Sequence, residues 1–183
     1  MNEEGAYSDL ATAGALRGSP LGRLDRALVT ELVSGSVKRR YTLDWVLSRY
    51  LAQGLAQTPP WTRNILRLAA YQLLFLDRIP AAAACDTAVE LAKKYAPRTA
   101  GLVNAVLRRL AREGWPPLPR YEDDPVAHLA VKHAHPPWLV ARWLARWGRE
   151  WTEALCRADN ERPPLALRVN TLKQDAVRVQ DAL

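Results

Sequence analysis

The chain has 183 residues, enough for one well-packed core or for one domain and part of a second. It has no apolar run near the roughly 20 residues that span a bilayer, and its first residues, Met1 to Glu4, are acidic where a secretory signal is basic. We therefore expect a cytoplasmic protein with no membrane partner. Cys85 and Cys156, the only cysteines, exclude a disulfide framework and a cysteine zinc site.

The net charge of +7 is unevenly distributed along the chain. Residues 1–37 carry −2, residues 115–183 carry +1, and residues 38–114, with 13 basic and 5 acidic residues, carry +8. Such an excess of charged residues usually lies on helix faces that are exposed to solvent. Within one small helical segment, however, it favours a polyanionic partner, and RNA first.

Apolar residues at helical spacing predict a run of helices in the first third of the chain. The first fifteen residues form a short amphipathic piece. Ser19 can cap the next helix, with Pro20 in its first turn, and this helix is expected to run to the basic triplet Lys38-Arg39-Arg40. Thr42 can cap a further helix, whose apolar stripe runs from Leu43 to Leu55.

Residues 61–80 contain the most apolar segment and are expected to form the helix on which the others pack. Thr58 can cap this helix, Pro59 suits its first turn, and Ile79-Pro80 ends it because proline cannot continue a helix. The apolar residues of this stretch are expected to be core and nothing more. Function must therefore be sought on the surrounding surface.

Two further helices complete the first unit. One runs from Ala81 to about Tyr95, and the other starts near Thr99 and ends at Gly114. The proline-dense stretch 115–119 then marks a boundary.

Beyond the boundary the pattern predicts short helices, near residues 126–132, 139–147 and 151–158, followed by a half-buried strand at 165–170. A helical pattern begins at Thr171 and stops at Leu183, and the strand has no partner in sight. We therefore expect the chain to be cut off within its second domain.

The residues that catalysis requires are missing. No group of close glycines follows a strand, so no loop for a phosphate or a cofactor is predicted. His128, His133 and His135 have no carboxylate or cysteine at a recognised ligand spacing, so no metal site is expected. Neither cysteine has a histidine partner in a recognisable motif. The chain by itself is not expected to be an enzyme.

Binding chemistry remains. Arginine and lysine contact phosphates, and aromatic rings can stack on unpaired bases. Trp45, Trp143 and Trp147 lie at or beside apolar stripes and are expected to be core rather than stacking platforms. The basic candidates for RNA contact are Lys38, Arg39, Arg40, Arg63, Arg67, Lys93, Lys94, Arg108, Arg109 and Arg112.

Several motifs occur in an order that resembles a known family. Residues 31–35 (ELVSG) precede Leu43-Asp44-Trp45, and residues 70–75 (AYQLLF) and 101–108 (GLVNAVLR) follow. This order resembles the NusB-like domain at the N-terminus of the bacterial RsmB (Sun, Fmu) 16S rRNA cytosine-C5 methyltransferases. The motifs at 135–139 (HPPWL) and 158–170 are similar to the segment that opens the methyltransferase portion of that family.

The resemblance implies an all-α NusB-like bundle over residues 1–114, a linker over 115–125, and over 126–183 the truncated start of an α/β RNA-binding segment. It implies RNA, above all 16S rRNA, as the partner, with Arg162, Arg168 and Asn170 adding to the contacts. The S-adenosylmethionine-binding domain and the catalytic cysteine of the family would lie after Leu183. No catalytic, cofactor-binding or metal-binding residue is therefore carried over.

Two alternatives stay open at this point. One is a stand-alone NusB-like adaptor that binds RNA with a ribosomal or transcription protein, in transcription antitermination or ribosome biogenesis. The segment after Pro119 argues against it. The other is a helix-turn-helix protein that binds DNA, which rests only on short helices and positive charge, so no DNA partner is expected.

Overall fold

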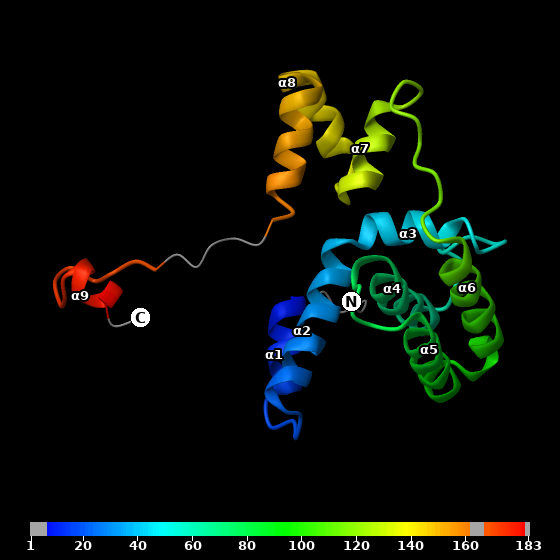
Figure 1. The fold of residues 1–183 in the computed structure, drawn as a ribbon. Coiled ribbons are helices and arrows are strands. Elements are labelled where there is room, and N and C mark those ends of the chain that lie inside the picture. The colour runs from blue at the N-terminus through cyan, green and yellow to red at the C-terminus, as the bar shows by residue number, and fades with distance from the viewer. Residues whose placement is uncertain (1–6, 162–166, 182–183) are drawn as a thin grey trace.

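The computed structural model describes residues 7–161 and 167–181, and this part of the chain is helical (Figure 1). None of its helices is both long and apolar enough to cross a membrane. The helices are α1 (Ser8–Leu16), α2 (Arg23–Lys38), α3 (Arg40–Ser48), α4 (Pro60–Phe75), α5 (Ala81–Tyr95), α6 (Ala100–Glu113), α7 (Pro125–His133), α8 (Pro137–Ala158) and α9 (Ala176–Asp181), with a 3-10 turn at Pro97–Thr99.

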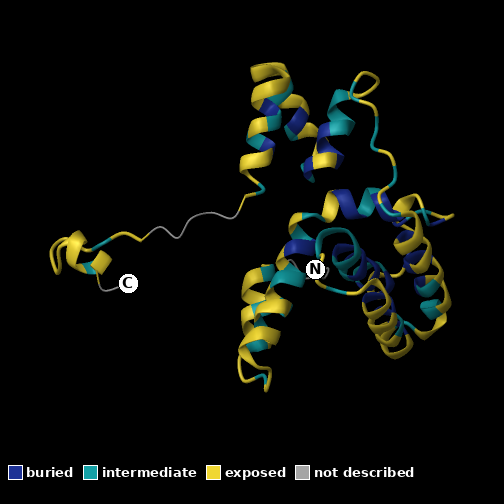
Figure 2. Ribbon diagram, viewed as in Figure 1, coloured by how far each residue is buried: buried dark blue, intermediate teal, exposed yellow. Residues whose placement is uncertain are grey.

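The first core is built around α4, which packs against α2, α3, α5 and α6 (Figures 1 and 2). Apolar side chains of these helices meet there because each helix keeps one apolar face. The expected central position of this helix is confirmed. The fully buried large side chains of the first core are Leu43, Val46, Leu47, Leu66, Val103, Leu107 and Leu110.

The ends of α4 differ from the expectation. Pro59 is the N-cap residue and Pro60 occupies the first turn, while the hydroxyl of Thr58 donates to the Gly54 carbonyl instead of capping. The helix ends at Phe75, because Leu76 adopts an extended conformation with φ −122°. The chain then turns before α5, so Pro80 precedes the next helix rather than stopping this one.

Two other predicted caps are also wrong. Helix α2 begins at Arg23 after Gly22, and the Ser19 hydroxyl accepts from the Leu21 amide within a turn. Helix α3 already begins at Arg40, so Thr42 lies inside it and is fully buried. The Thr42 hydroxyl donates to the Val131 carbonyl of α7, a partner that is remote in sequence.

Helices α7 and α8 enclose a second, smaller core formed by Leu129, Ala130, Val140 and Cys156. The Asp124 carboxylate caps α7 by accepting from the Ala127 amide. The two helices predicted after Trp138 are joined as α8, with a kink at Gly148, where φ is 71°. Trp147 is 45% exposed, so the prediction that it is a core residue is wrong.

The predicted strand at 165–170 is not found where the chain is described. Residues 167–170 are not in a strand, and Leu165 and Ala166 lie outside the described residues. A strand needs a neighbour for its backbone hydrogen bonds, and the described ranges offer none. The helix expected from Thr171 begins only at Ala176. The Asp175 carboxylate, just before it, accepts a hydrogen bond from the Val177 amide.

Candidate nucleic-acid interface

The predicted basic residues occupy different environments, and one of them is internal. Arg67 is 8% exposed, and its guanidinium donates to both carboxylate oxygens of Asp44, at 2.6 and 2.7 Å. This paired geometry is the strongest form of an arginine–carboxylate contact. Arg67 therefore joins α4 to α3, and it is not available to a phosphate.

Arg39 and Arg63 are half-buried. The Arg39 guanidinium lies 5.2 Å from the ring centroid of Phe75, and burial lowers the pKa of Arg39. Arg63 lies in the first half of α4. Arg168 and Asn170 are exposed, and the Asn170 side chain accepts from the Leu172 amide. Arg162 lies outside the described residues.

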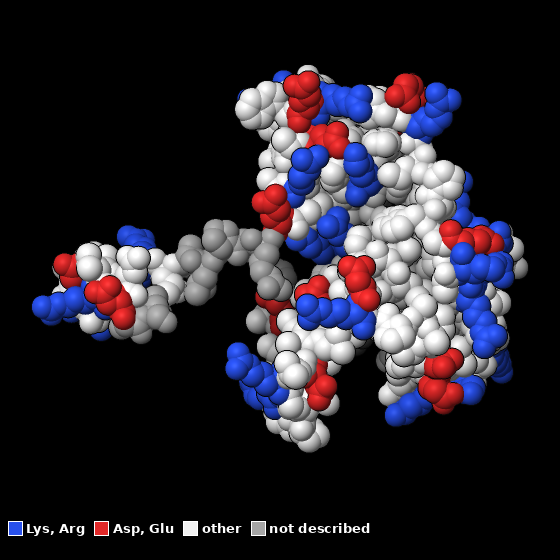
Figure 3. Space-filling view, viewed as in Figure 1, with Lys and Arg blue, Asp and Glu red and all other residues white. Residues whose placement is uncertain are grey.

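Most of the exposed candidates lie on α5 and α6, where Figure 3 shows basic side chains running down the α6 side of the molecule. Several are already paired. Arg109 and Arg112 both donate to Glu113, at 3.0 and 3.1 Å, and Lys93 donates to Glu90 at 2.7 Å. These exposed pairs are weak, but they reduce the net charge of this surface.

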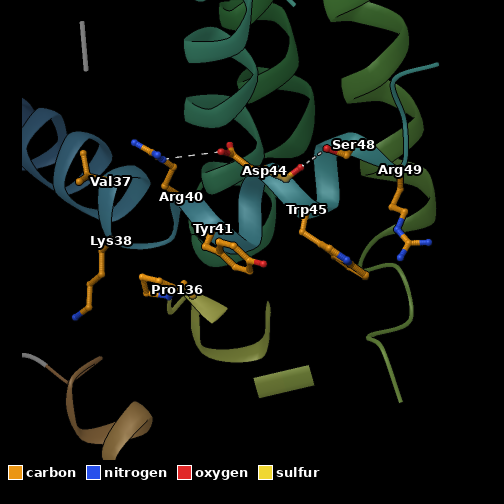
Figure 4. Close-up of a pocket in the computed structure, with 10 residues that line it drawn as sticks. Val37, Lys38, Arg40, Tyr41, Asp44, Trp45, Ser48, Arg49 and Pro136 are labelled. Carbon is orange, nitrogen blue, oxygen red and sulfur yellow. Dashed lines mark hydrogen bonds and ion pairs between the residues drawn. The ribbon is translucent and has the colours of Figure 1, made fainter. Parts of the chain in front are cut away.

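Lys38 and Arg40 lie instead at a groove between α3 and the turn that joins α7 to α8 (Figure 4). We call it the α3 groove, and its volume is about 770 Å³. Its lining residues are Val37, Lys38, Arg40, Tyr41, Asp44, Trp45, Ser48, Arg49, Ala134 and Pro136.

The α3 groove is electropositive. Three basic side chains and one carboxylate line it, a net charge of +2. The carboxylate is that of Asp44, and its charge is also balanced by the buried Arg67. The nitrogen of Arg40 nearest to this carboxylate is 3.9 Å away, which makes that contact a weak one. Lys38 donates to a backbone carbonyl, that of Asn160, at 2.8 Å, and within the described ranges neither Lys38 nor Arg49 forms a salt bridge.

Aromatic rings accompany these charges. Tyr41 is 36% exposed, and Trp45, half-buried, carries the Arg49 guanidinium 4.6 Å from its ring centroid. In Figure 4 the Tyr41 ring extends from α3 toward the segment that contains Pro136, whereas the Trp45 ring points away from Pro136 and toward the side of Arg49. Burial raises the pKa of Tyr41, with the Asp124 carboxylate as the second cause, so its hydroxyl stays neutral and can donate a hydrogen bond.

The prediction from the sequence missed Arg49, Tyr41 and the exposed side of Trp45. A signal was present, because Tyr41, Trp45 and Arg49 follow one another at intervals of four residues along α3 and its C-cap, and so lie on one side of this helix. This face lies beside the buried stripe of Leu43, Val46 and Leu47.

The three histidines do not converge on a metal site. His128 contacts the Pro119 carbonyl at 2.8 Å, His133 faces Glu153 at 3.5 Å, and His135 faces Asp159 at 3.5 Å. Throughout residues 7–161 and 167–181, no group of three or more His, Cys, Asp or Glu side chains could hold a metal ion.

Comparison with known proteins identifies the family. Residues 1–112 match the NusB family. The chain belongs to the NusB family. Residues 135–183 of this NusB-family chain match a second family, described as the RsmF/B-like methyltransferase, ferredoxin-like domain.

The curated relatives carry both parts in one longer protein. The chain is 36% identical over 184 residues to the probable ribosomal RNA small subunit methyltransferase B of Bacillus subtilis (strain 168). It is also 36% identical over 184 residues to the protein of that name from Synechocystis sp. (strain ATCC 27184 / PCC 6803 / Kazusa). Each match covers 100% of this chain and 41% of the relative. The predicted resemblance to the N-terminal region of this methyltransferase family is confirmed.

A solved structure shares the fold. The crystal structure of PH0851 superposes with a TM-score of 0.69 over 94% of this NusB-family chain and 39% of the other chain, at 22% identity. The helical structure and the match of residues 1–112 to the NusB family together confirm the predicted NusB-like helical bundle.

Proposed function

We propose that this chain is the RNA-binding, substrate-recognition part of a ribosomal RNA cytosine-C5 methyltransferase that acts on 16S rRNA. The names of the relatives support a role in methylation of the small-subunit RNA. The match over residues 135–183 favours this function over a stand-alone NusB-like adaptor. The chain spans about two-fifths of the length of those relatives.

S-adenosylmethionine, the methyl donor of the methyltransferase family, does not fit the described residues. Such a cofactor is held by a glycine-rich loop that follows a strand, and residues 7–161 and 167–181 contain no strand. We therefore assign no residue of this chain to the cofactor or to the methyl transfer.

The observation that carries the proposal is the α3 groove. It combines a net charge of +2 with exposed aromatic surface, and its cations Lys38 and Arg49 are free of salt bridges within the described ranges. Cations supply the affinity for phosphates, and aromatic rings supply contacts to bases. A basic surface without aromatic rings would bind duplex and single-stranded nucleic acid alike.

The test compares two variants that lose the same charge. In one, Lys38, Arg40 and Arg49 are changed to Gln; in the other, Lys93, Lys94 and Arg108 are changed to Gln. We expect the groove variant to lose more affinity for a fragment of 16S rRNA. The slope of log affinity against log salt should also fall by roughly 2 if all three cations meet phosphates.

An equal or larger loss in the variant on α5 and α6 would place the RNA surface there. RNA binding by the unaltered protein that does not change between 50 and 200 mM salt, two conditions about fourfold apart, would contradict electrostatic recognition altogether. Equal affinity for duplex DNA would favour the DNA-binding alternative.

A further inference from the structure

We propose that the α3 groove is a site for one unpaired nucleotide of an RNA strand, with the base against the rings of Tyr41 and Trp45 and the flanking phosphates on Lys38 and Arg49. This inference rests on the proposed function and deepens it, because it names the form of RNA that the groove accepts.

The size and the walls of the groove suit such a ligand. Its volume of about 770 Å³ lies within the roughly 300–1,000 Å³ of small-ligand pockets. One wall is α3, and the other is the turn at Ala134 and Pro136. A base can lie between these walls only if it is unpaired, because the bases of a duplex are stacked and face inward.

The cations are placed at both ends of the groove. Figure 4 shows Lys38 beside Pro136 at one end and Arg49 beyond Trp45 at the other. A strand that lies along α3 would therefore meet a positive charge before and after the aromatic rings. This alternation of charge and aromatic surface is how single-stranded nucleic acid is commonly held.

Tyr41 offers the more open ring of the two, because Trp45 packs partly against the first core. The Arg49 guanidinium, 4.6 Å from the Trp45 centroid, can extend the stacking surface of that ring. The Ser48 hydroxyl is occupied by the Asp44 backbone carbonyl, to which it donates at 2.7 Å. Asp44 itself is held by Arg67, so its carboxylate does not repel a phosphate as a free anion would.

Rings and cations also occur together elsewhere, but with less free charge. The pocket of about 270 Å³ at Tyr50 and Trp115 is lined by Arg49 and Arg109, and Arg109 is paired there with Glu113. Trp61 and Tyr95 stack on each other, with ring centroids 4.9 Å apart, so each covers one face of the other. The groove at Trp147 and Trp151 is lined only by apolar residues, and the nearby cation, Arg146, lies outside that lining, 5.5 Å from the centroid of the Trp147 ring.

The experiment measures the dissociation constant of a single-stranded hexanucleotide for the full chain and its variants. Tyr41→Leu should weaken binding by about 5- to 150-fold, the loss that corresponds to one stacked base. Tyr41→Phe keeps the ring and should bind nearly as the unaltered protein does. The matched control is Tyr95→Leu, another exposed tyrosine, which should leave the affinity unchanged.

The outcomes separate this inference from the proposed function. If Tyr41→Leu binds the hexanucleotide normally while the Gln variant of Lys38, Arg40 and Arg49 does not, RNA binding stands and the nucleotide site is wrong. If a duplex of the same sequence depends equally on Tyr41, the site is wrong as well. AMP alone should bind at least tenfold more weakly, and equal affinity would mean a free-nucleotide site. If the unaltered protein binds no RNA, both proposals fail.

Discussion

Arg67 shows how the same residue type can serve the surface or the interior. Its guanidinium bridges α4 to Asp44 of α3, although the sequence alone placed it among the RNA contacts. The pair also removes a negative charge from the α3 groove. Arg67 is therefore a positioning residue, and at the proposed RNA site it would act only through Asp44.

Arg67→Met should lower the free energy of unfolding by about 1–3 kcal/mol, because Asp44 loses its partner while it is only partly exposed. Urea denaturation measures this change. The double variant Asp44→Asn with Arg67→Met should regain part of the loss, since no unpaired charge then remains. A single variant as stable as the unaltered protein would show that the pair contributes no stability.

Gly35 is required for a different physical reason, the close approach of α2 to α4. A Cβ atom at Gly35 would lie 2.1 Å from Cζ of Tyr71. The Tyr71 ring cannot move freely, because its hydroxyl donates to Glu31 at 2.7 Å and its ring stacks on Phe75.

We expect Gly35→Ala to destabilise the protein by about 1–3 kcal/mol through this overpacking. Thermal unfolding followed by circular dichroism would measure the effect. Gly101→Ala is the control, because no atom lies within 4 Å of its added Cβ and the helix should tolerate it. Equal melting temperatures for the two variants would contradict the close approach.

At the scale of elements, the pair α7 and α8 contains a titratable group in its interior. His133 is 8% exposed, with Glu153, Lys132 and His135 around it. Burial lowers the pKa of His133 below its ordinary 6.5, and this outweighs the opposing effect of Glu153. The folded protein therefore binds this proton more weakly than the unfolded chain does.

It follows that His133 contributes stability above the unfolded pKa of about 6.5, and that this contribution is lost as the pH falls through the lower, folded pKa. We expect the free energy of unfolding to decline on acidification below pH of about 6.5. In His133→Gln this part of the decline should be absent, and an unchanged pH profile in that variant would assign the decline to other groups.

At the scale of the whole molecule, α3 is the element on which both cores meet. Its buried face supplies the first core, its next face lines the α3 groove, and Thr42 reaches α7. The Val131 carbonyl that accepts from Thr42 lies in the last turn of α7, where carbonyls have no partner within the helix. Lys38 adds a second link, to Asn160 after α8.

Thr42→Val should therefore cost about 1–3 kcal/mol, because the buried Val131 carbonyl loses its donor while side-chain volume is kept. Hydrogen exchange of the α7 amides should quicken more than that of the α4 amides. Thr87→Val, at an exposed position of α5, is the matched control. Unchanged exchange in α7 would mean that this hydrogen bond does not join the two parts.

The sequence by itself determined the helical architecture, the central place of α4, the concentration of basic residues in 38–114 and the family, because periodicity, composition and ordered motifs are local properties of the chain. The division into domains at residues 114 and 125 stays a prediction, although each side has a core of its own. Helix ends were less well predicted, since Thr42 and Thr58 resemble caps but have other partners.

Only the tertiary structure decided which basic residues face outward and what surrounds them. Arg67 meets Asp44 across 23 positions, Thr42 meets Val131 across 89, and Lys38 meets Asn160 across 122. The α3 groove likewise depends on the fold, because Ala134 and Pro136 line it together with residues of α3 that are far away in the sequence. The spacing of such residues in the sequence does not predict that they lie close together. Their proximity arises when separate helices bury their apolar faces against one another.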